Sequence, residues 1–287
     1  DYKVTGVQTC ALPISGSRGQ DARIRLDGGR LESRVAPQRG PAARYRIETP
    51  TAVIGVRGTD FRVIWDDQRH TARAEVTEGR VAVSTRRNGQ RLVDAGQGLL
   101  LPPDAPASKV KLPAAPVLAD GLPKSFSRSA IRLPLPPLGE LSAWRVMVVA
   151  TSGAQSGAVF VDQRETGNDA RIANLPDGNY HLLVRGIDGR GVEGLEARHA
   201  FSMQARPEPP FYTQPASGKA TAGEVLLSWT GAPEAESYRL EVAGPDGFDA
   251  ASVIRRETGE TRLSVPLQAG AYQWRIASVS PDGRTGP

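Results

Sequence analysis

The chain has 287 residues, with 36 Lys+Arg against 31 Asp+Glu, a formal net charge of +5 and 39% hydrophobic residues. At ~100–200 residues per domain this length suggests two or three domains, and the apolar fraction is too high for a disordered chain. One cysteine excludes an internal disulfide and thiolate metal clusters, and no apolar run approaches the ~20 residues that a membrane helix needs.

The first residues are predicted to be foreign to the rest of the chain. Residues 4–14 resemble the in-frame translation of a common sequencing-library adapter. The alternative is a short apolar leader, but a signal peptide needs a basic start and a ~7–15-residue apolar stretch, and Gln8, Thr9 and Pro13 interrupt this one. We therefore expect residues 1–15 to be non-native, so that the natural N-terminus is missing.

Alternation of apolar and polar residues is the main periodicity of the chain. It runs through residues 22–26, 30–35, 45–48 and 80–84, and it is typical of strands with one buried and one solvent-facing side. No stretch of a dozen residues has helical spacing, so the pattern predicts an all-β protein. Asp-Gly pairs, which supply the positive φ that tight hairpins need, recur at 27–28, 120–121, 177–178, 188–189, 246–247 and 282–283.

The most specific motif lies in residues 44–63. It consists of a Thr-Pro pair, a small apolar run, and then Val-Arg-Gly-Thr, any residue and a phenylalanine. This segment resembles the FecR domain, and residues 75–83 and 93–98 match the strand pair and the closing turn that follow in that family. We place this domain at 16–101. The resemblance assigns the family motif, as a structural corner or an interaction site, to Thr49, Pro50, Val56, Arg57, Gly58, Thr59 and Phe61.

The residues of this block predict a small, solenoid-like β-roll. Val53, Ile54 and Val56 form a nearly continuous apolar run, as expected for a strand covered on both faces. Gly58 interrupts the pattern where a sharp corner or a close backbone approach is needed. Short strands separated by such corners favour a roll whose turns bury one shared interior. Within it, Arg57 and Asp60 are interpreted as a corner salt bridge and not as a catalytic pair.

Two proline-rich segments divide the chain into three blocks. Proline cannot donate regular ladder bonds, so residues 102–121 and 206–210 are predicted to be extended linkers. The second block, 122–205, and the third, 211–287, repeat each other at offsets of 92–94 residues. A period near ninety residues is the size of one β-sandwich.

The second and third blocks resemble fibronectin type III domains. Trp229 looks like the core tryptophan, and Tyr272, the repeat of Tyr180, looks like the corner tyrosine whose ring enters the core and whose hydroxyl bonds the corner backbone. In the second block the proline-rich residues 133–137 replace the tryptophan strand, so this strand must be short or lie at an edge. The chain stops where the last strand should begin, so we expect a truncated C-terminus with an unpaired sheet edge.

Few residues have the types that catalysis or metal binding needs. Residues 66–70, Asp-Asp-Gln-Arg-His, contain metal-ligand types, but they lie where a hairpin turn belongs. The sequence contains no Gly-x-Ser-x-Gly, His-Glu-x-x-His or phosphate-cradling glycine motif. We therefore expect no catalytic residue, no metal site and no cofactor.

The positive charge is mostly arginine, and it is spread singly along the predicted strands. A nucleic-acid binder concentrates its charge and interleaves aromatic residues for stacking. We therefore expect solvated strand faces, no nucleic-acid partner, and at most a weak, salt-screened attraction to anionic envelope polymers. The arginines concerned in the first block are Arg23, Arg25, Arg30, Arg34, Arg44, Arg46, Arg57 and Arg62.

Two functions fit this organisation. FecR domains followed by fibronectin-like sandwiches resemble periplasmic or surface proteins, in many of which a peptidoglycan-binding LysM module precedes the FecR domain. This resemblance implies a non-catalytic envelope scaffold that binds a protein or a cell-wall polymer. The alternative is a FecR-type transmembrane sigma-factor regulator that responds to an outer-membrane transporter. Fibronectin-like copies stand where the transporter-contacting domain would follow, so the scaffold is the first expectation, and a periplasmic or cell-envelope location follows from the family alone.

Overall fold

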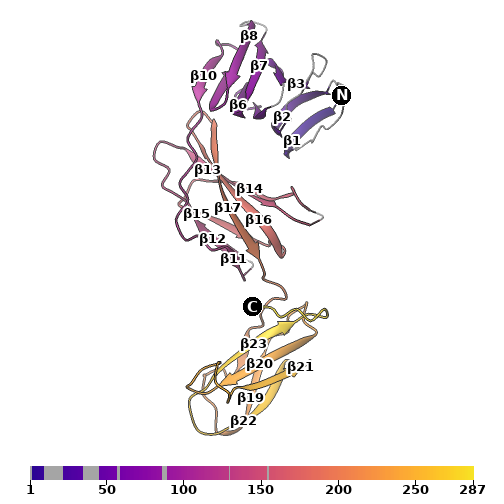
Figure 1. Cartoon of the computed structure of the whole chain (residues 1–287), viewed down its shortest axis with the longest axis vertical. Helices are drawn as coiled ribbons and strands as arrows, with labels where there is room; N and C mark the ends of the chain where they lie inside the picture. The colour runs from indigo at the N-terminus through magenta and orange to yellow at the C-terminus, as the bar shows by residue number, and fades with distance from the viewer. Residues whose placement is uncertain are drawn as a thin grey trace. The chain divides into compact units, whose positions relative to one another are not determined.

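The protein is built from strands, as the alternating pattern predicts (Figure 1). The computed structural model describes residues 2–9, 22–34, 45–56, 59–85, 89–128, 130–153 and 155–287. Within these ranges no helix has the length and apolar character to cross a membrane. The chain divides into two compact units. The first contains Asp1–Asp120, Pro134–Ala170 and His181–His199, and the second contains Gly121–Leu133, Arg171–Tyr180 and Ala200–Pro287.

A ten-stranded sheet forms the first block. Its order is β10-β9-β6-β5-β2-β3-β4-β7-β8, with β1 beside β2. β2 runs parallel to β1 and β3, and the other neighbours are antiparallel. β8, at one edge, also contacts β6 near the other edge, so the sheet curls into a nearly closed barrel, here called the barrel. Its strands are β1 (Tyr2–Thr9), β2 (Ala22–Arg34), β3 (Tyr45–Glu48), β4 (Ala52–Val56), β5 (Asp60–Asp66), β6 (Thr71–Glu78), β7 (Arg80–Thr85), β8 (Gly89–Asp94), β9 (Gln97–Leu101) and β10 (Ser108–Lys111).

The barrel encloses one apolar interior, which confirms the prediction of a shared core. Side chains from five strands are fully buried in it: Leu26, Ile47, Ile54, Val63 and Val83. The expectation that the strand around Ile54 is covered on both faces is wrong. Val53 is 38% exposed, because successive side chains of a barrel strand alternate between the interior and the outer wall.

Strand β10 lies in the segment predicted to be a proline-rich linker. It pairs antiparallel with β9, and the Leu112 N–H continues the pattern by donating to the Gly96 oxygen at 2.9 Å. The four residues of β10 include no proline, so each of them can donate a ladder bond. The barrel therefore continues beyond residue 101, while the placement of the domain boundaries stays a prediction.

Two β-sandwiches of the fibronectin type III kind follow the barrel. One has sheets β11-β17-β16-β13-β14 and β12-β15, and the other has sheets β18-β19-β22 and β21-β20-β23 (Figure 1). The strands of the first are β11 (Ser125–Phe126), β12 (Ala130–Pro134), β13 (Ala143–Ala150), β14 (Val159–Glu165), β15 (Asp169–Ala173), β16 (Gly178–Ile187) and β17 (Glu193–Met203). Those of the second are β18 (Tyr212–Gln214), β19 (Gly223–Trp229), β20 (Ser237–Ala243), β21 (Ile254–Thr258), β22 (Arg262–Leu267) and β23 (Gln273–Val279).

The predicted sandwich details are mostly confirmed. Trp229 is buried in the core of the last sandwich, and β12 is a five-residue strand in a two-stranded sheet, as predicted from the proline-rich residues 133–137. The Tyr180 hydroxyl donates to the Pro176 oxygen at 2.8 Å, which is the expected corner bond. Within residues 155–287, β23 is an edge strand, and the chain beyond it contributes one isolated bridge, between Val279 and Thr285.

The corner tyrosine of the last sandwich is an exception. Tyr272 is 40% exposed, whereas Tyr180 is 3% exposed and stacks on Phe201 of β17 at a centroid distance of 5.6 Å. The prediction that the Tyr272 ring enters the core is therefore wrong. The physical reason is the unpaired edge: beside β23 no strand equivalent to β17 brings a covering ring, within the described residues 155–287.

Candidate functional site

The family-motif residues are mainly part of the barrel core. Val56, Thr59 and Phe61 are buried, and Phe61 packs edge-on against Tyr45. Thr49 closes the turn before β4, since its hydroxyl accepts from the Ala52 N–H at 3.1 Å. Pro50 is exposed on that turn. Arg57 and Gly58, and with them the predicted corner salt bridge, lie outside the described residues.

Residues 66–70 form the predicted hairpin turn between β5 and β6. The Asp66 Oδ1 accepts from the N–H groups of Gln68 and Arg69, both at 3.1 Å. Burial opposes the charge of Asp66, but the bond from the Arg69 N–H and the charge of Arg73 lower its pKa below the usual value. His70 has a φ of 49°, so it serves as a turn residue. In the ranges that the structure describes, no group of three or more His, Cys, Asp or Glu side chains is placed to hold a metal ion.

Four arginines and four glutamates meet in a buried cluster on the outer face of the barrel, here called the ion network. It lies within the first unit and joins barrel strands β2, β5 and β6 to strands β13, β16 and β17 of the next sheet. The arginines and glutamates are equal in number, and the additional partners at the margin, Asp162 on Arg145 and Arg198 on Glu196, also carry opposite charges, so the formal charges cancel. The members are Arg30, Arg62, Arg145, Arg185, Glu32, Glu75, Glu193 and Glu196.

Arg62 lies at the centre of the network and is 1% exposed. Its Nε is 2.9 Å from Glu75 Oε2, although the two are too poorly aligned for a hydrogen bond. Its Nη2 donates to the backbone oxygens of Glu193 at 2.8 Å and Gly194 at 2.9 Å. Burial lowers the pKa of Arg62 and raises the pKa of Glu75, and the opposite charge of each partner acts against these two shifts.

Glu193 comes from the next sheet and lies between charged residues of the barrel and of its own sheet. Its side chain pairs with Arg30 of β2, and its Oε1 also accepts from Arg145 Nη1 at 3.2 Å. Its backbone N–H donates to Glu75 Oε1 at 2.9 Å. Burial opposes the charge of Glu193, but Arg30 and Arg145 outweigh it and lower its pKa.

Glu32 and Arg185 form the outer part of the network. Arg185 of β16 donates to both carboxylate oxygens of Glu32, at 2.8 and 2.6 Å, and it also pairs with Glu196. Burial raises the pKa of Glu32, but the bond and charge of Arg185 and the charge of Arg30 outweigh burial and lower this pKa to about 2. Two-point pairing of this kind fixes the angle between the partners as well as their distance.

The network is suited to holding two sheets in one geometry and not to catalysis. Buried ion pairs add little net stability compared with apolar packing, but removing one partner is costly. Each carboxylate named here already has at least one arginine partner. An apolar cluster beside it, Val110, Leu112 and Val192 with Leu100 and Leu195, supplies the hydrophobic part of the same contact.

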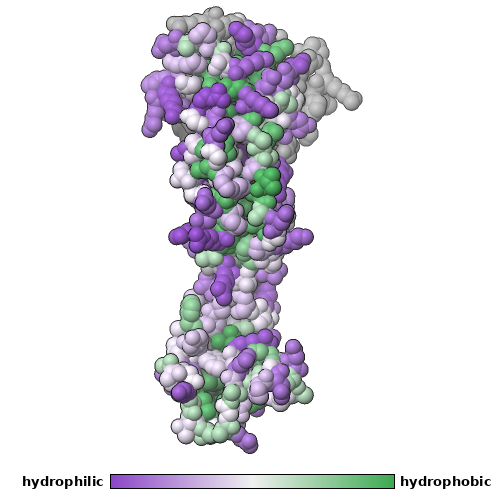
Figure 2. Space-filling view, turned by 90° about the vertical axis from the view of Figure 1, so that its left-hand side faces the viewer, coloured by the Kyte–Doolittle hydropathy of each residue, from purple (hydrophilic) through white to green (hydrophobic). Residues whose placement is uncertain are grey.

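The sequence pattern did not predict this network. We expected Arg30 and Arg62 to be solvated, but both are buried, whereas Arg23 and Arg25 are exposed as expected. A signal was present: Arg62 stands in a strand whose neighbours Phe61, Val63, Ile64 and Trp65 are all apolar, and its cross-strand partner is Glu75. Hydrophilic side chains are otherwise scattered among hydrophobic ones on the face in Figure 2, as expected for a modest net charge.

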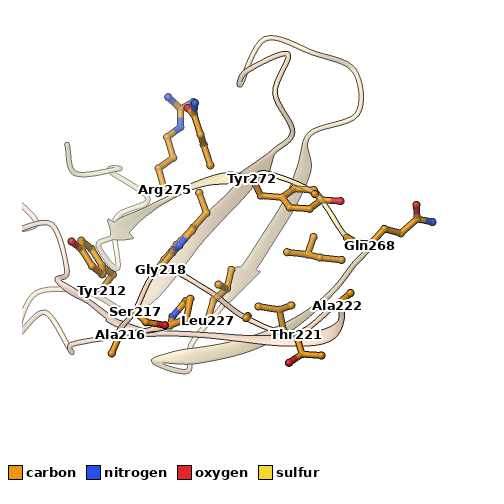
Figure 3. A pocket seen from close by; sticks show the side chains of 18 of the residues that line it. Tyr212, Ala216, Ser217, Gly218, Thr221, Ala222, Leu227, Gln268, Tyr272 and Arg275 are labelled. Carbon is orange, nitrogen blue, oxygen red and sulfur yellow. The ribbon is translucent and has the colours of Figure 1, made fainter.

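A second candidate site is a groove of about 900 Å³ in the last sandwich. It opens between β19 and β23, with Tyr212 and Tyr272 at separate places on its rim and Leu227 in its floor (Figure 3). Arg275 is its one charged lining residue within the fully described range 155–287, and Arg275 Nε donates to Glu241 at 2.6 Å. A groove of this size, lined by both polar and apolar residues, is suited to binding.

Comparison with known families gives a name to the first block. The FecR protein family matches residues 10–82. This part of the chain is a FecR domain. The match begins inside the segment 1–15 that we expect to be adapter-derived, and it ends before residue 101. The FecR domain therefore contributes Arg30, Glu32, Arg62 and Glu75 to the ion network.

The solved structures that resemble the chain are similar at a low level. A putative anti-sigma factor from Parabacteroides distasonis ATCC 8503 is 16% identical, with a TM-score of 0.24 over 26% of this chain and 35% of that protein, so the chain spans about a third of its length. Two fibronectin type III domains of chicken tenascin are 16% identical, with a TM-score of 0.30 over 58% of this chain and 91% of that one. The FN1–FN3 domains of chicken CNTN1 are 11% identical, with a TM-score of 0.27 over 91% and 95%. No curated protein matches the chain.

Proposed function

We propose that this protein is a non-catalytic regulator of the FecR type that works in the periplasm or cell envelope by binding another protein. The FecR domain supports a regulator more directly than a peptidoglycan scaffold. The observation that carries the proposal is the ion network, because it joins the FecR domain to strands β13, β16 and β17 through buried, charge-specific contacts.

Such a regulator acts by transmitting a change of position and not by catalysing a reaction. A partner that binds the FecR domain changes its position or its stability, and a contact that tolerates few alternative geometries transmits that change to the next sheet. The network meets this requirement, since Arg62 and Glu75 are both about 1% exposed and their partners come from strands on both sides. Displacing either side leaves buried charges without partners, which makes intermediate positions unfavourable.

The test is a binding measurement with the whole chain. The partner tested is the periplasmic domain of an outer-membrane transporter, and binding is followed by calorimetric titration. We expect saturable one-to-one binding, and we expect no retention of the chain on isolated peptidoglycan sacculi. Arg46→Met serves as a control for nonspecific charge effects, because Arg46 is exposed on the same barrel.

A scaffold is the second candidate, and the repeated sandwiches favour it. Two copies at offsets of 92–94 residues suit a spacer that holds a binding block away from an anchor. In that case the chain is retained by sacculi in a salt-dependent manner and does not bind the transporter domain. Retention on sacculi together with no binding of the transporter domain would contradict the regulator function and support the scaffold.

A further inference from the structure

The chain places a short segment of the next sheet, Val192–Gly194, against the outer face of strands β2, β5 and β6. All the polar backbone groups that Glu193 and Gly194 direct at the barrel are met: the Glu193 N–H by Glu75, and the two carbonyl oxygens by Arg62 at 2.8 and 2.9 Å. The Glu193 carboxylate pairs with Arg30. Proteins bind extended peptides by contacts of this kind, which are hydrogen bonds to backbone N–H and carbonyl groups together with a specific contact to a side chain.

The residues around Val192–Gly194, here called the seat, determine which residue type fits at each of the three positions. Val192 is fully buried beside Val110 and Leu112, so the first position is apolar. The second position carries a carboxylate that pairs with Arg30 of the barrel. The third must be glycine, because a Cβ at Gly194 would lie 2.5 Å from the Pro113 oxygen and 2.8 Å from the Pro113 Cβ. The sequence that fits is therefore apolar–Glu–Gly.

We propose that the seat formed by Arg30, Arg62 and Glu75 is a peptide-recognition site that Val192–Gly194 fills as a tethered ligand, and that its partner in the signalling state is an extended apolar–Glu–Gly segment of another protein. The part of the proposal that concerns signalling rests on the regulator function. A tethered ligand acts at an effective concentration on the order of millimolar, so a partner segment binds well only when the tethered one is released.

The experiment uses the whole chain and a fluorescein-labelled peptide of residues 190–197. Gly194→Val removes the fit at Pro113 but leaves Arg30, Arg62 and Glu75 unchanged. Gly189→Ala is the matched control, since Gly189 lies in the turn that precedes β17 and a Cβ there meets no atom within 4 Å. We expect the peptide to bind Gly194→Val at least about tenfold more tightly than it binds the wild type or Gly189→Ala.

Amide hydrogen exchange supplies the second readout. The Leu195 N–H donates to the Pro113 oxygen at 2.8 Å, so its exchange reports whether the segment is seated. We expect exchange at Leu195 to accelerate by at least about 100-fold in Gly194→Val and to stay unchanged in Gly189→Ala. A Glu193→Gln variant of the chain, which keeps the backbone shape, is measured in the same way in case Gly194→Val does not fold.

Two results would overturn the proposal. One is unchanged protection of Leu195 in both Gly194→Val and Glu193→Gln. The other is a released segment with no gain in peptide binding, or equal binding of a peptide in which Glu193 is replaced by Gln. Because neither readout involves the transporter domain, failure of the regulator function alone leaves these results unchanged.

Discussion

Removal of the Arg62 guanidinium is expected to destabilise the first unit strongly. In Arg62→Met the side chain keeps a similar length, but Glu75 loses the cation 2.9 Å away, and the oxygens of Glu193 and Gly194 lose their donor. Breaking a buried ion pair by removing one partner costs about 3–5 kcal/mol, because the remaining charge stays buried. For a unit of this size each kcal/mol lowers the melting temperature by about 2–4 °C, so we expect a fall of roughly 6–20 °C.

Calorimetry and urea titration monitored by the fluorescence of Trp65 and Trp144, both buried in the first unit, measure this effect. Arg46→Met is the matched control, since it removes an exposed arginine from the same barrel and is expected to change stability by less than about 0.5 kcal/mol. The two variants lose the same charge and differ in burial.

The double variant Arg62→Met/Glu75→Gln tests the stated cause. Glutamine keeps an oxygen that accepts from the Glu193 N–H but carries no charge, so we expect it to recover at least about 2 kcal/mol of the loss. Additive losses in the double variant, or a loss below about 1 kcal/mol in Arg62→Met alone, would refute the argument that the unpaired charge dominates.

Three further predictions follow from individual contacts. The pKa of Glu32 falls from 4.5 to about 2 on folding, which corresponds to about 3 kcal/mol of stability. This stability is fully present above pH 4.5 and is lost as the pH falls towards 2. Urea titrations of wild type and Glu32→Gln at pH 7 and pH 3 should therefore show a smaller difference between the two proteins at the lower pH. Tyr180→Phe removes the bond to Pro176 and should cost about 1 kcal/mol of stability. Tyr272→Phe should cost less than about 0.5 kcal/mol, since that ring is exposed. Equal losses of stability in thermal melting would contradict the difference between the two corners. His70→Gly should be neutral or slightly stabilising because His70 has a φ of 49°, and His70→Val should cost about 1–3 kcal/mol; a tolerated valine would show that the turn relaxes.

Local pattern was sufficient for much of the fold. Period-two alternation predicted the strands around Ile24, Ile47 and Val81, and the polar run at residues 66–70 predicted the β5–β6 turn. The Tyr180 corner was predicted from the repeat and forms the expected bond. These features depend on residues that are neighbours in sequence, where backbone geometry and side-chain alternation leave few choices.

Tertiary structure decided which polar residues are buried and which apolar residues are not. Arg30 and Glu193 are 163 residues apart in the chain, and alternation along β2 cannot distinguish an outer face that meets water from one that meets another sheet. The same uncertainty explains Val53 and Tyr272, whose exposure depends on what packs beside them. The sequence by itself determined the strands, the turns and the FecR motif, because these follow from local geometry; burial is set by the elements that chain folding brings together, and so the ion network belongs to the tertiary structure alone.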